Sequence, residues 1–223
     1  MTNNDIELLI SQGYVKLPSL RSIEDPSEII NAKHSSTYTS GSEFQKRYHE
    51  IIDLNKITNQ LSEIAFSKFN IKVDKTDVYK ILRVVQSSNI KESYRMHFDS
   101  HLFTLVTPVV IPKISSSESG QLITFPNLRV EPISNIYNFV SKLFYKFFFQ
   151  GKKNIIKLSK TNKTVEFDFY DNVPILFLGR STLHGSRGFD KIPEGIRITM
   201  LTHFFDPSPK YGIGNLIRLI RNR

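Results

Sequence analysis

The chain has 223 residues, of which 39% are hydrophobic, so it is long enough for one domain with a substantial buried core. It contains no cysteine, which excludes disulfides, thiolate metal sites and cysteine nucleophiles. The net charge of +9 is compatible with anionic small molecules, an acidic membrane surface or nucleic acid as partners.

The first fourteen residues, MTNNDIELLISQGY, lack the basic and apolar regions of a secretion signal. No apolar run reaches the roughly 18 residues that a membrane-spanning helix needs. We therefore expect a cytoplasmic protein without a transmembrane segment.

The N-terminal part, residues 1–76, is predicted to form a mostly helical layer. Residues 5–10 have the apolar periodicity of a short helix, and residues 13–17 are typical of a short strand. Residues 44–69 carry apolar side chains at helical spacing, which predicts a helix that packs one face on a sheet.

Strands dominate residues 77–207. The β-rich segments are 78–85, 94–99, 102–111, 121–125, 154–158, 164–170, 174–178 and 196–205. A helix is predicted at residues 135–149, within an insertion (135–150) whose apolar positions would cover the sheet. This pattern favours a single domain over residues 1–223, mainly β with flanking helices and a barrel or jelly-roll core.

The segment His97-Phe98-Asp99 carries a candidate metal site. Side chains two residues apart on a strand point to the same face, about 6.6 Å apart along the backbone, so His97 and Asp99 can approach one ion. Two histidines and one carboxylate on one side of a first-row transition ion leave three positions open for other ligands. His101 lies two residues after Asp99 and would point to the same strand face, so it is an alternative ligand.

A second set of residues follows the apolar strand at 174–178. His184 comes shortly after it, and Arg197-Ile198-Thr199 follows a loop. The order and spacing of these motifs over residues 78–205 resemble the Fe(II)/2-oxoglutarate-dependent dioxygenase superfamily, in its phytanoyl-CoA hydroxylase-like, small-molecule hydroxylase type. The resemblance implies a double-stranded β-helix, which is a cupin-like jelly roll.

The resemblance also implies a role for each motif residue. His97, Asp99 and His184 would bind Fe(II), Arg197 would pair with the distal carboxylate of 2-oxoglutarate, and Thr199 would add a hydroxyl contact. An arginine fork gives two parallel hydrogen bonds to a carboxylate, which a lysine cannot. No catalytic residue beyond the metal ligands is implied, and dioxygen is the second co-substrate.

Residues of this chain differ from those of particular groups within the superfamily. The prolyl 4-hydroxylase group uses a lysine where this chain has Arg197, and halogenating members replace the carboxylate that Asp99 supplies. The second arginine that AlkB-type demethylases carry after the co-substrate arginine is missing here. Nucleic acid is therefore not an expected partner.

Arg95 shares the parity of His97 and Asp99, so it is predicted to face the barrel interior. A guanidinium there needs an anionic partner, either a protein carboxylate or an anionic group of the substrate. Arg180 and Arg187 flank His184 and could also guide an anion, whereas His203 is expected to be structural or at the rim.

These observations predict an oxygenase that hydroxylates a C–H bond of a small anionic substrate. One alternative is the same chemistry on a protein side chain or nucleic acid, and another is a non-enzymatic jelly-roll binding protein. The basic tail, residues 208–223, includes a short amphipathic stretch that would contact a membrane, the body of the protein or a second subunit. The sequence makes no prediction of the oligomeric state.

Overall fold

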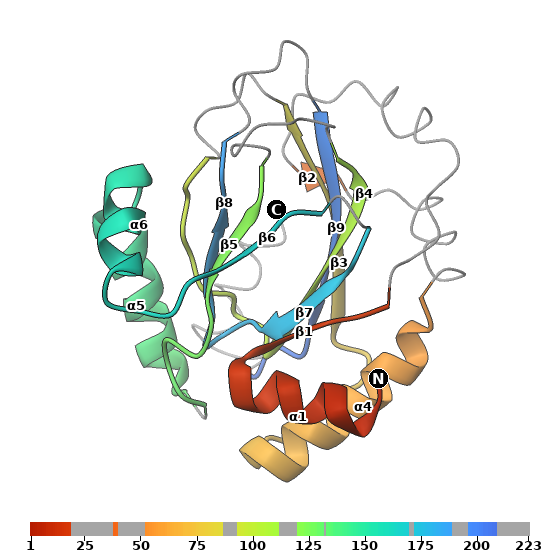
Figure 1. The fold of residues 1–223 in the computed structure, drawn as a ribbon. Helices are drawn as coiled ribbons and strands as arrows, with labels where there is room; N and C mark the ends of the chain where they lie inside the picture. Colours follow the sequence, from red (N-terminus) through yellow and green to blue (C-terminus); the bar gives the residue numbers. More distant parts are fainter. Residues whose placement is uncertain are drawn as a thin grey trace.

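The computed structural model describes residues 1–18, 38–39, 52–86, 93–111, 120–131, 133–169, 172–188 and 196–208. Two antiparallel sheets face each other, and helices flank the pair (Figure 1). The first eight residues of the helix predicted at 44–69, and the tail from residue 209 onward, lie outside the described residues.

The N-terminal elements have clear start and stop signals. Helix α1 (Asn3–Gln12) begins with a capping box between Thr2 and Asp5, and Gly13 ends it with a φ of 84°, a left-handed conformation that glycine adopts readily. Strand β1 (Tyr14–Lys16) follows. Helix α4 (Leu54–Phe69) begins where the Asp53 side chain accepts a hydrogen bond from the Lys56 amide.

Eight further strands, β2 to β9, complete the two sheets. The larger sheet has the order β1-β7-β4-β9-β3-β2, with β2 (Tyr38–Thr39), β3 (Val78–Gln86), β4 (Phe103–Val110), β7 (Ile175–Leu178) and β9 (Ile196–Phe204). The smaller sheet has the order β6-β5-β8, with β5 (Leu122–Phe125), β6 (Val165–Phe167) and β8 (Leu183–Ser186). This is the mainly β architecture with flanking helices that the order of β-rich and helical segments predicted.

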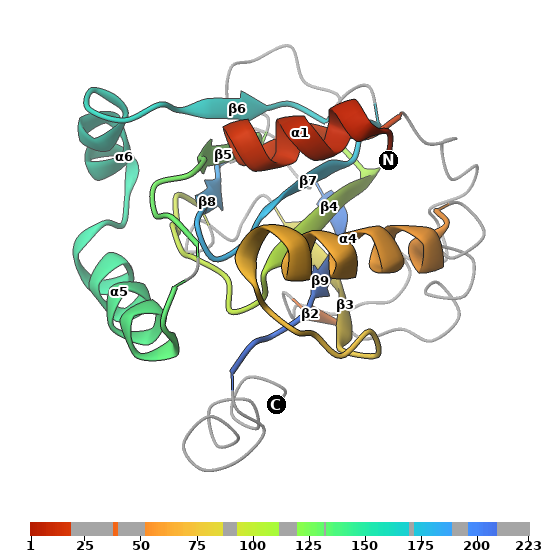
Figure 2. The ribbon, with the colours of Figure 1, turned by 90° about the horizontal axis from the view of Figure 1, so that it is seen from below.

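Helices α1 and α4 cover the outer face of the larger sheet (Figure 2). Their apolar faces, including Leu9, Leu61 and Ile64, form one core cluster with sheet residues such as Leu105 and Met200. A second cluster, which includes Leu122, Phe167, Ile175 and Phe177, joins residues of both sheets. Burial of these side chains provides the main driving force for folding and fixes the sheets around the cavity described below.

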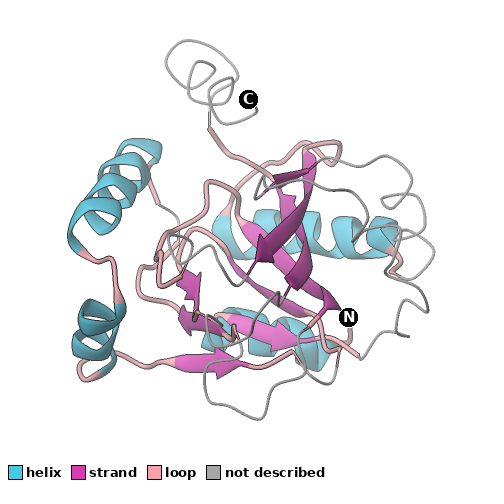
Figure 3. Cartoon of the chain, turned by 90° about the horizontal axis from the view of Figure 1, so that it is seen from above, coloured by secondary structure: helices cyan, strands magenta, loops and turns pink. Residues whose placement is uncertain are grey.

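Helices α5 (Asn135–Phe148) and α6 (Lys152–Ser159) lie on the other flank, beside the smaller sheet (Figure 3). The strand predicted at residues 154–158 is wrong, because this segment is helical: Ile155 and Leu158, one turn apart, pack on the smaller sheet. The apolar positions of α5 also differ from the expectation. They are exposed, and the polar Asn138 and Ser141 face inward.

The segment around His97 is not a regular strand. Only isolated bridges form there, between Arg95 and Gln150 and between His97 and His184, so the strand predicted at residues 94–99 is corrected. His184, in contrast, lies within β8, which the sequence did not predict. No helix in the described part of the chain is long and apolar enough to cross a bilayer.

Candidate metal centre

Backbone hydrogen bonds bring the three candidate ligands together. His97 and His184 exchange both amide-to-carbonyl bonds, at 2.9 and 3.0 Å, which fixes their side chains next to each other. The Asp99 amide donates to the Gly179 carbonyl at 3.0 Å. The His97–Asp99 segment is therefore held against β8 and the turn that follows β7.

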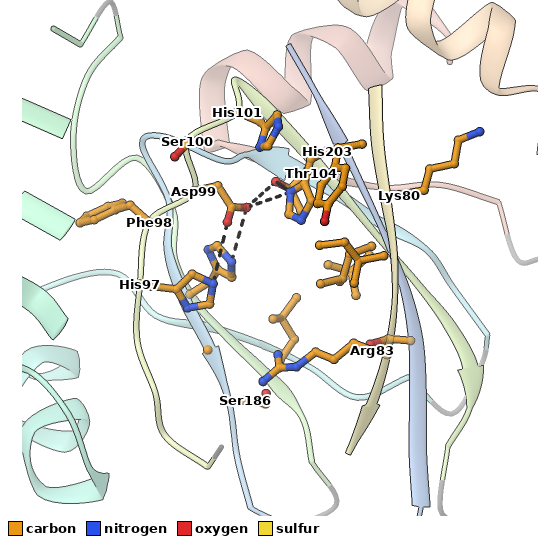
Figure 4. Close-up of a pocket in the computed structure, with 18 of the residues that line it drawn as sticks. Lys80, Arg83, His97, Phe98, Asp99, Ser100, His101, Thr104, Ser186 and His203 are labelled. Carbon is orange, nitrogen blue, oxygen red and sulfur yellow. Dashed lines mark hydrogen bonds and ion pairs between the residues drawn. The ribbon is translucent and has the colours of Figure 1, made fainter. Parts of the chain in front are cut away.

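The side chains converge on one point, and Figure 4 shows His97 and Asp99 pointing toward each other there. His97 Nε2 lies 3.8 Å from Asp99 Oδ1, and His184 Nε2 lies 3.6 Å from Asp99 Oδ2. One ligand atom from each residue lies within 4.8 Å of the other two. Since bonds from nitrogen or oxygen to such ions are about 2.1 Å long, separations near twice that length allow one ion to contact all three atoms.

The hydrogen bonds of the imidazoles orient the correct nitrogen toward this point. His97 Nδ1 lies 3.2 Å from the Arg95 carbonyl oxygen, and His184 Nδ1 lies 3.1 Å from the Thr182 carbonyl oxygen. A carbonyl only accepts, so each Nδ1 carries the proton and each Nε2 presents a lone pair. Metal-binding histidines in proteins are usually oriented in this way.

A hydroxyl group and a third imidazole fix the Asp99 carboxylate. Thr104 Oγ1 donates to Asp99 Oδ2 at 2.5 Å, and His203 Nδ1 lies 3.0 Å from the same hydroxyl. Because the single hydroxyl proton goes to Asp99, His203 Nδ1 must donate to Thr104. His101 stacks on His203 with ring centroids 5.0 Å apart and is not part of the cluster of ligand atoms.

The protonation states suit metal binding. Burial by itself raises the pKa of Asp99, but the neighbouring His184 and His203 outweigh it and hold this pKa well below its usual range. Desolvation and the adjacent His184 lower the pKa of His97, and desolvation lowers that of His184. Neutral imidazoles and a charged carboxylate are the forms that bind a first-row transition ion, so the residues present fit such an ion.

A buried arginine lies in the same cavity. Arg197 is 3% exposed, and its Nη2 donates to Ser186 Oγ at 3.0 Å while its Nη1 donates to the Gly120 carbonyl. Arg197 and Thr199 lie two residues apart on β9, and both line the cavity. These contacts fix the guanidinium, which is a requirement for binding a carboxylate with two parallel bonds.

The cavity has a volume of about 510 Å³ and lies between the two sheets. Alternate residues of β9, from Arg197 to His203, line it together with Arg83 of β3 and Lys142 of α5. Arg83 pairs with Thr199 across β3 and β9, and its charge contributes to the lowered pKa values of both candidate histidine ligands. No sequence motif contains Arg83, so its place in the cavity was not predicted.

The structure does not bring Arg95 to this site. Arg95 is exposed and is not among the residues that line the cavity. Parity failed as a guide because the segment is irregular, so residues 95 and 97 do not share a strand face. The substrate-binding role expected of Arg95 is therefore withdrawn.

Arg180 and Arg187 have structural partners. Arg180 is 1% exposed, with Nε 3.5 Å from Glu131 Oε1, and it donates to the Ile133 carbonyl. Arg187 binds Glu166 through two hydrogen bonds of 2.8 and 2.6 Å. Neither arginine lines the cavity, so neither is in a position to guide an anion into it.

No protein-family model matches the chain, and no curated protein matches its sequence. Solved structures do match. The α-ketoglutarate-dependent carbocyclase SnoK of nogalamycin biosynthesis superposes with a TM-score of 0.52 at 15% identity, over 98% of this chain and 91% of its own. A prolyl 4-hydroxylase from Phytophthora capsici gives 0.52 at 9% identity, over 99% of this chain and 70% of its own.

The α-ketoglutarate-dependent epimerase SnoN, also of nogalamycin biosynthesis, gives a TM-score of 0.50 at 12% identity, over 92% of this chain and 80% of its own. This chain has the fold of the 2-oxoglutarate-dependent oxygenases. The double-stranded β-helix that the motifs implied is thereby confirmed. In this fold the candidate metal centre lies between the two sheets, with Arg197 on the central strand β9.

Proposed function

We propose that the chain is an Fe(II)- and 2-oxoglutarate-dependent oxygenase that hydroxylates a C–H bond of a small anionic substrate. The observation that carries this proposal is the convergence of His97, Asp99 and His184 in a cavity that also contains the buried Arg197. A metal site alone would fit many activities. A transition-metal site with open positions, beside a fixed guanidinium, fits an anionic co-substrate that reaches the metal.

Each residue has a defined part in this proposal. The Nε2 atoms of His97 and His184 and the carboxylate of Asp99 would hold Fe(II), and Thr104 orients the carboxylate. Arg197 would bind the distal carboxylate of 2-oxoglutarate, with the Thr199 hydroxyl on the same face of β9. The two sheets exclude bulk water from the inner end of the cavity, which strengthens these charge interactions.

Bound Fe(II) would supply activation of dioxygen. One oxygen atom enters the C–H bond of the substrate as a hydroxyl group, and the other enters succinate as 2-oxoglutarate loses carbon dioxide. Every electron in this reaction comes from the substrate and from 2-oxoglutarate, so no external reductant is needed. The protein would bind and orient both molecules.

The charge of the cavity supports an anionic substrate. Lys80, Arg83, Lys142 and Arg197 line it, and Asp99 is the single acidic residue among the described residues that do so. One cation would pair with 2-oxoglutarate and Asp99 would pair with the metal, which leaves an excess of positive charge. A volume of about 510 Å³ suits the co-substrate together with one small organic acid.

Release of succinate tests this function. The wild-type protein, incubated with Fe(II), 2-oxoglutarate and a panel of small carboxylic acids, should form succinate and a hydroxylated product, and the methyl esters of the same acids should react less. Asp99→Ala should abolish turnover, because it removes a ligand. The control Asp168→Ala removes an exposed carboxylate and should remain active. Turnover that persists in Asp99→Ala would reject the proposed metal centre.

A further inference from the structure

Helix α5 is amphipathic, but it presents its polar side to the protein. Asn138 and Ser141 are buried, and both accept hydrogen bonds from the Arg129 guanidinium. Arg129 also lies over the Phe98 ring, with its Cζ 3.5 Å from the ring centroid. This buried cation explains the orientation, because the helix must supply it with polar partners.

The apolar side of α5 therefore faces outward, on the flank of the molecule that Figure 1 shows on the left. Ile136 is 80% exposed, Phe147 is 71% exposed and Phe148 is 65% exposed. The other exposed apolar residues of α5 and α6 are Tyr137, Phe139, Val140, Leu143, Phe144 and Ile156. We call all nine residues the α5–α6 apolar face. Contiguous exposed apolar surface of this kind usually marks an interaction site.

The charged residues of the segment that forms this face have a single sign. Residues 135–163 contain seven lysines and no acidic residue, although the whole chain has 21 aspartates and glutamates. Six of these lysines are exposed: Lys146, Lys152, Lys153, Lys157, Lys160 and Lys163. A partner must therefore combine apolar contact with negative charge.

We propose that the α5–α6 apolar face docks on the surface of an anionic lipid bilayer. Apolar helix faces flanked by lysines lie in the interface of such bilayers, with the apolar side chains among the acyl chains and the lysines at the headgroups. A second copy of the chain is the weaker match, because the two lysine-rich surfaces would repel each other across the interface. A bilayer supplies negative charge and hydrocarbon together.

The docked face lies close to the cavity. On the inner side of α5, Asn138 Nδ2 lies 3.4 Å from the Asp99 carbonyl oxygen, and Lys142 Nζ donates to Ser100 Oγ at 2.8 Å. Lys142 also lines the cavity. The helix that contacts the lipid is thus the one that holds the segment with the candidate ligand Asp99.

Co-sedimentation of the full-length protein with vesicles tests the apolar part of the proposal. We expect binding to vesicles of phosphatidylcholine with phosphatidylserine, and at least tenfold weaker binding to pure phosphatidylcholine. The double variant Ile136→Asp/Phe147→Asp should lose at least tenfold in affinity for the mixed vesicles. Phe66→Asp/Ser67→Asp, which changes two exposed residues of α4 and adds the same charge, is the matched control and should bind like the wild type.

Lysine variants test the charge part without altering any apolar residue. Lys153→Glu/Lys157→Glu should weaken binding to the mixed vesicles by at least about fivefold per lysine, and high salt should have a similar effect. Lys68→Glu/Lys72→Glu is the matched control and should leave binding unchanged. Both sets of variants should keep the wild-type melting temperature, since the altered side chains are solvent-exposed.

Three results would overturn the proposal. The first is equal binding of the wild type to both kinds of vesicle. The second is an equal loss in the control variants, which would show a general effect of charge. The third is self-association of the wild type that Ile136→Asp/Phe147→Asp abolishes, together with no vesicle binding, which would assign the face to a second copy.

Discussion

Thr104 connects the candidate metal centre to the larger sheet. It is 1% exposed on β4, donates to Asp99 and accepts from His203, and His203 in turn lies on the neighbouring strand β9. The carboxylate orientation therefore depends on two strands of the sheet, although Asp99 itself lies on an irregular segment. Hydrogen bonds of this kind determine how tightly ligands hold a metal.

Replacing Thr104 by valine should weaken Fe(II) binding by about 10–100-fold, because the isosteric side chain removes the hydroxyl between Asp99 and His203. Thr104→Ser keeps the hydroxyl and should retain most of the affinity. Anaerobic calorimetric titration with Fe(II) measures both variants. Equal affinity of the valine variant and the wild type would show that the network does not support the metal site.

Among individual residues, the sequence predicted site residues that belong to a motif, and it did not predict those that lie outside one. His97, Asp99, His184 and Arg197 have a characteristic spacing, and the structure brings the first three together. Arg83 reaches the cavity because β3 pairs with β9, more than a hundred residues later in the chain. Such a long-range pairing leaves no local signal, and the local signal that Arg95 did carry, strand parity, was wrong.

Strand β8 controls the geometry of the site at the scale of elements. Gly185 follows His184 and faces the His97 segment so closely that an added Cβ would lie 2.6 Å from Met96 Sδ and 2.9 Å from the Arg95 carbonyl oxygen. The methionine side chain could move, but the carbonyl belongs to the backbone. A larger residue would push the two segments apart.

Gly185→Ala should therefore lower the free energy of unfolding by about 1–3 kcal/mol, as overpacking usually does, and weaken Fe(II) binding as His97 moves away from His184. Thermal unfolding and anaerobic Fe(II) titration measure the two effects. The double variant Gly185→Ala/Met96→Ala relieves only the sulfur contact, so it should remain impaired. A Gly185→Ala protein that equals the wild type in both measurements would contradict the packing described here.

The helical and strand patterns differed in how well they predicted the elements. Strands β3, β4 and β9 are eight or nine residues long and rich in β-branched residues, and they lie close to the predicted bounds. Residues 154–158 formed a helix instead, because a short segment with three apolar residues among five fits either structure. The orientation of α5 could not be predicted, since it depends on Arg129, a residue from another segment that is buried beneath the helix.

At the scale of the whole molecule, the two sheets with helices on both flanks enclose a cavity that has an excess of positive charge. The fold class was predictable because many β-rich segments in one part of the chain constrain the architecture more than any single strand does. The net charge of +9 was ambiguous in the sequence, since it did not say where the charge lies. In the structure, part of it lines the cavity and a larger part surrounds the α5–α6 apolar face.

The measurement that tests the central claim most directly is anaerobic binding of 2-oxoglutarate to the Fe(II)-loaded protein. The wild type should bind it in an Fe(II)-dependent manner. Arg197→Ala should keep its affinity for Fe(II) and lose roughly 2–5 kcal/mol of 2-oxoglutarate binding, about 30-fold or more in affinity. The control Arg187→Ala removes the partner of Glu166 outside the cavity and should bind 2-oxoglutarate like the wild type. Binding that does not require Fe(II), or that survives unchanged in Arg197→Ala, would contradict the proposed oxygenase site.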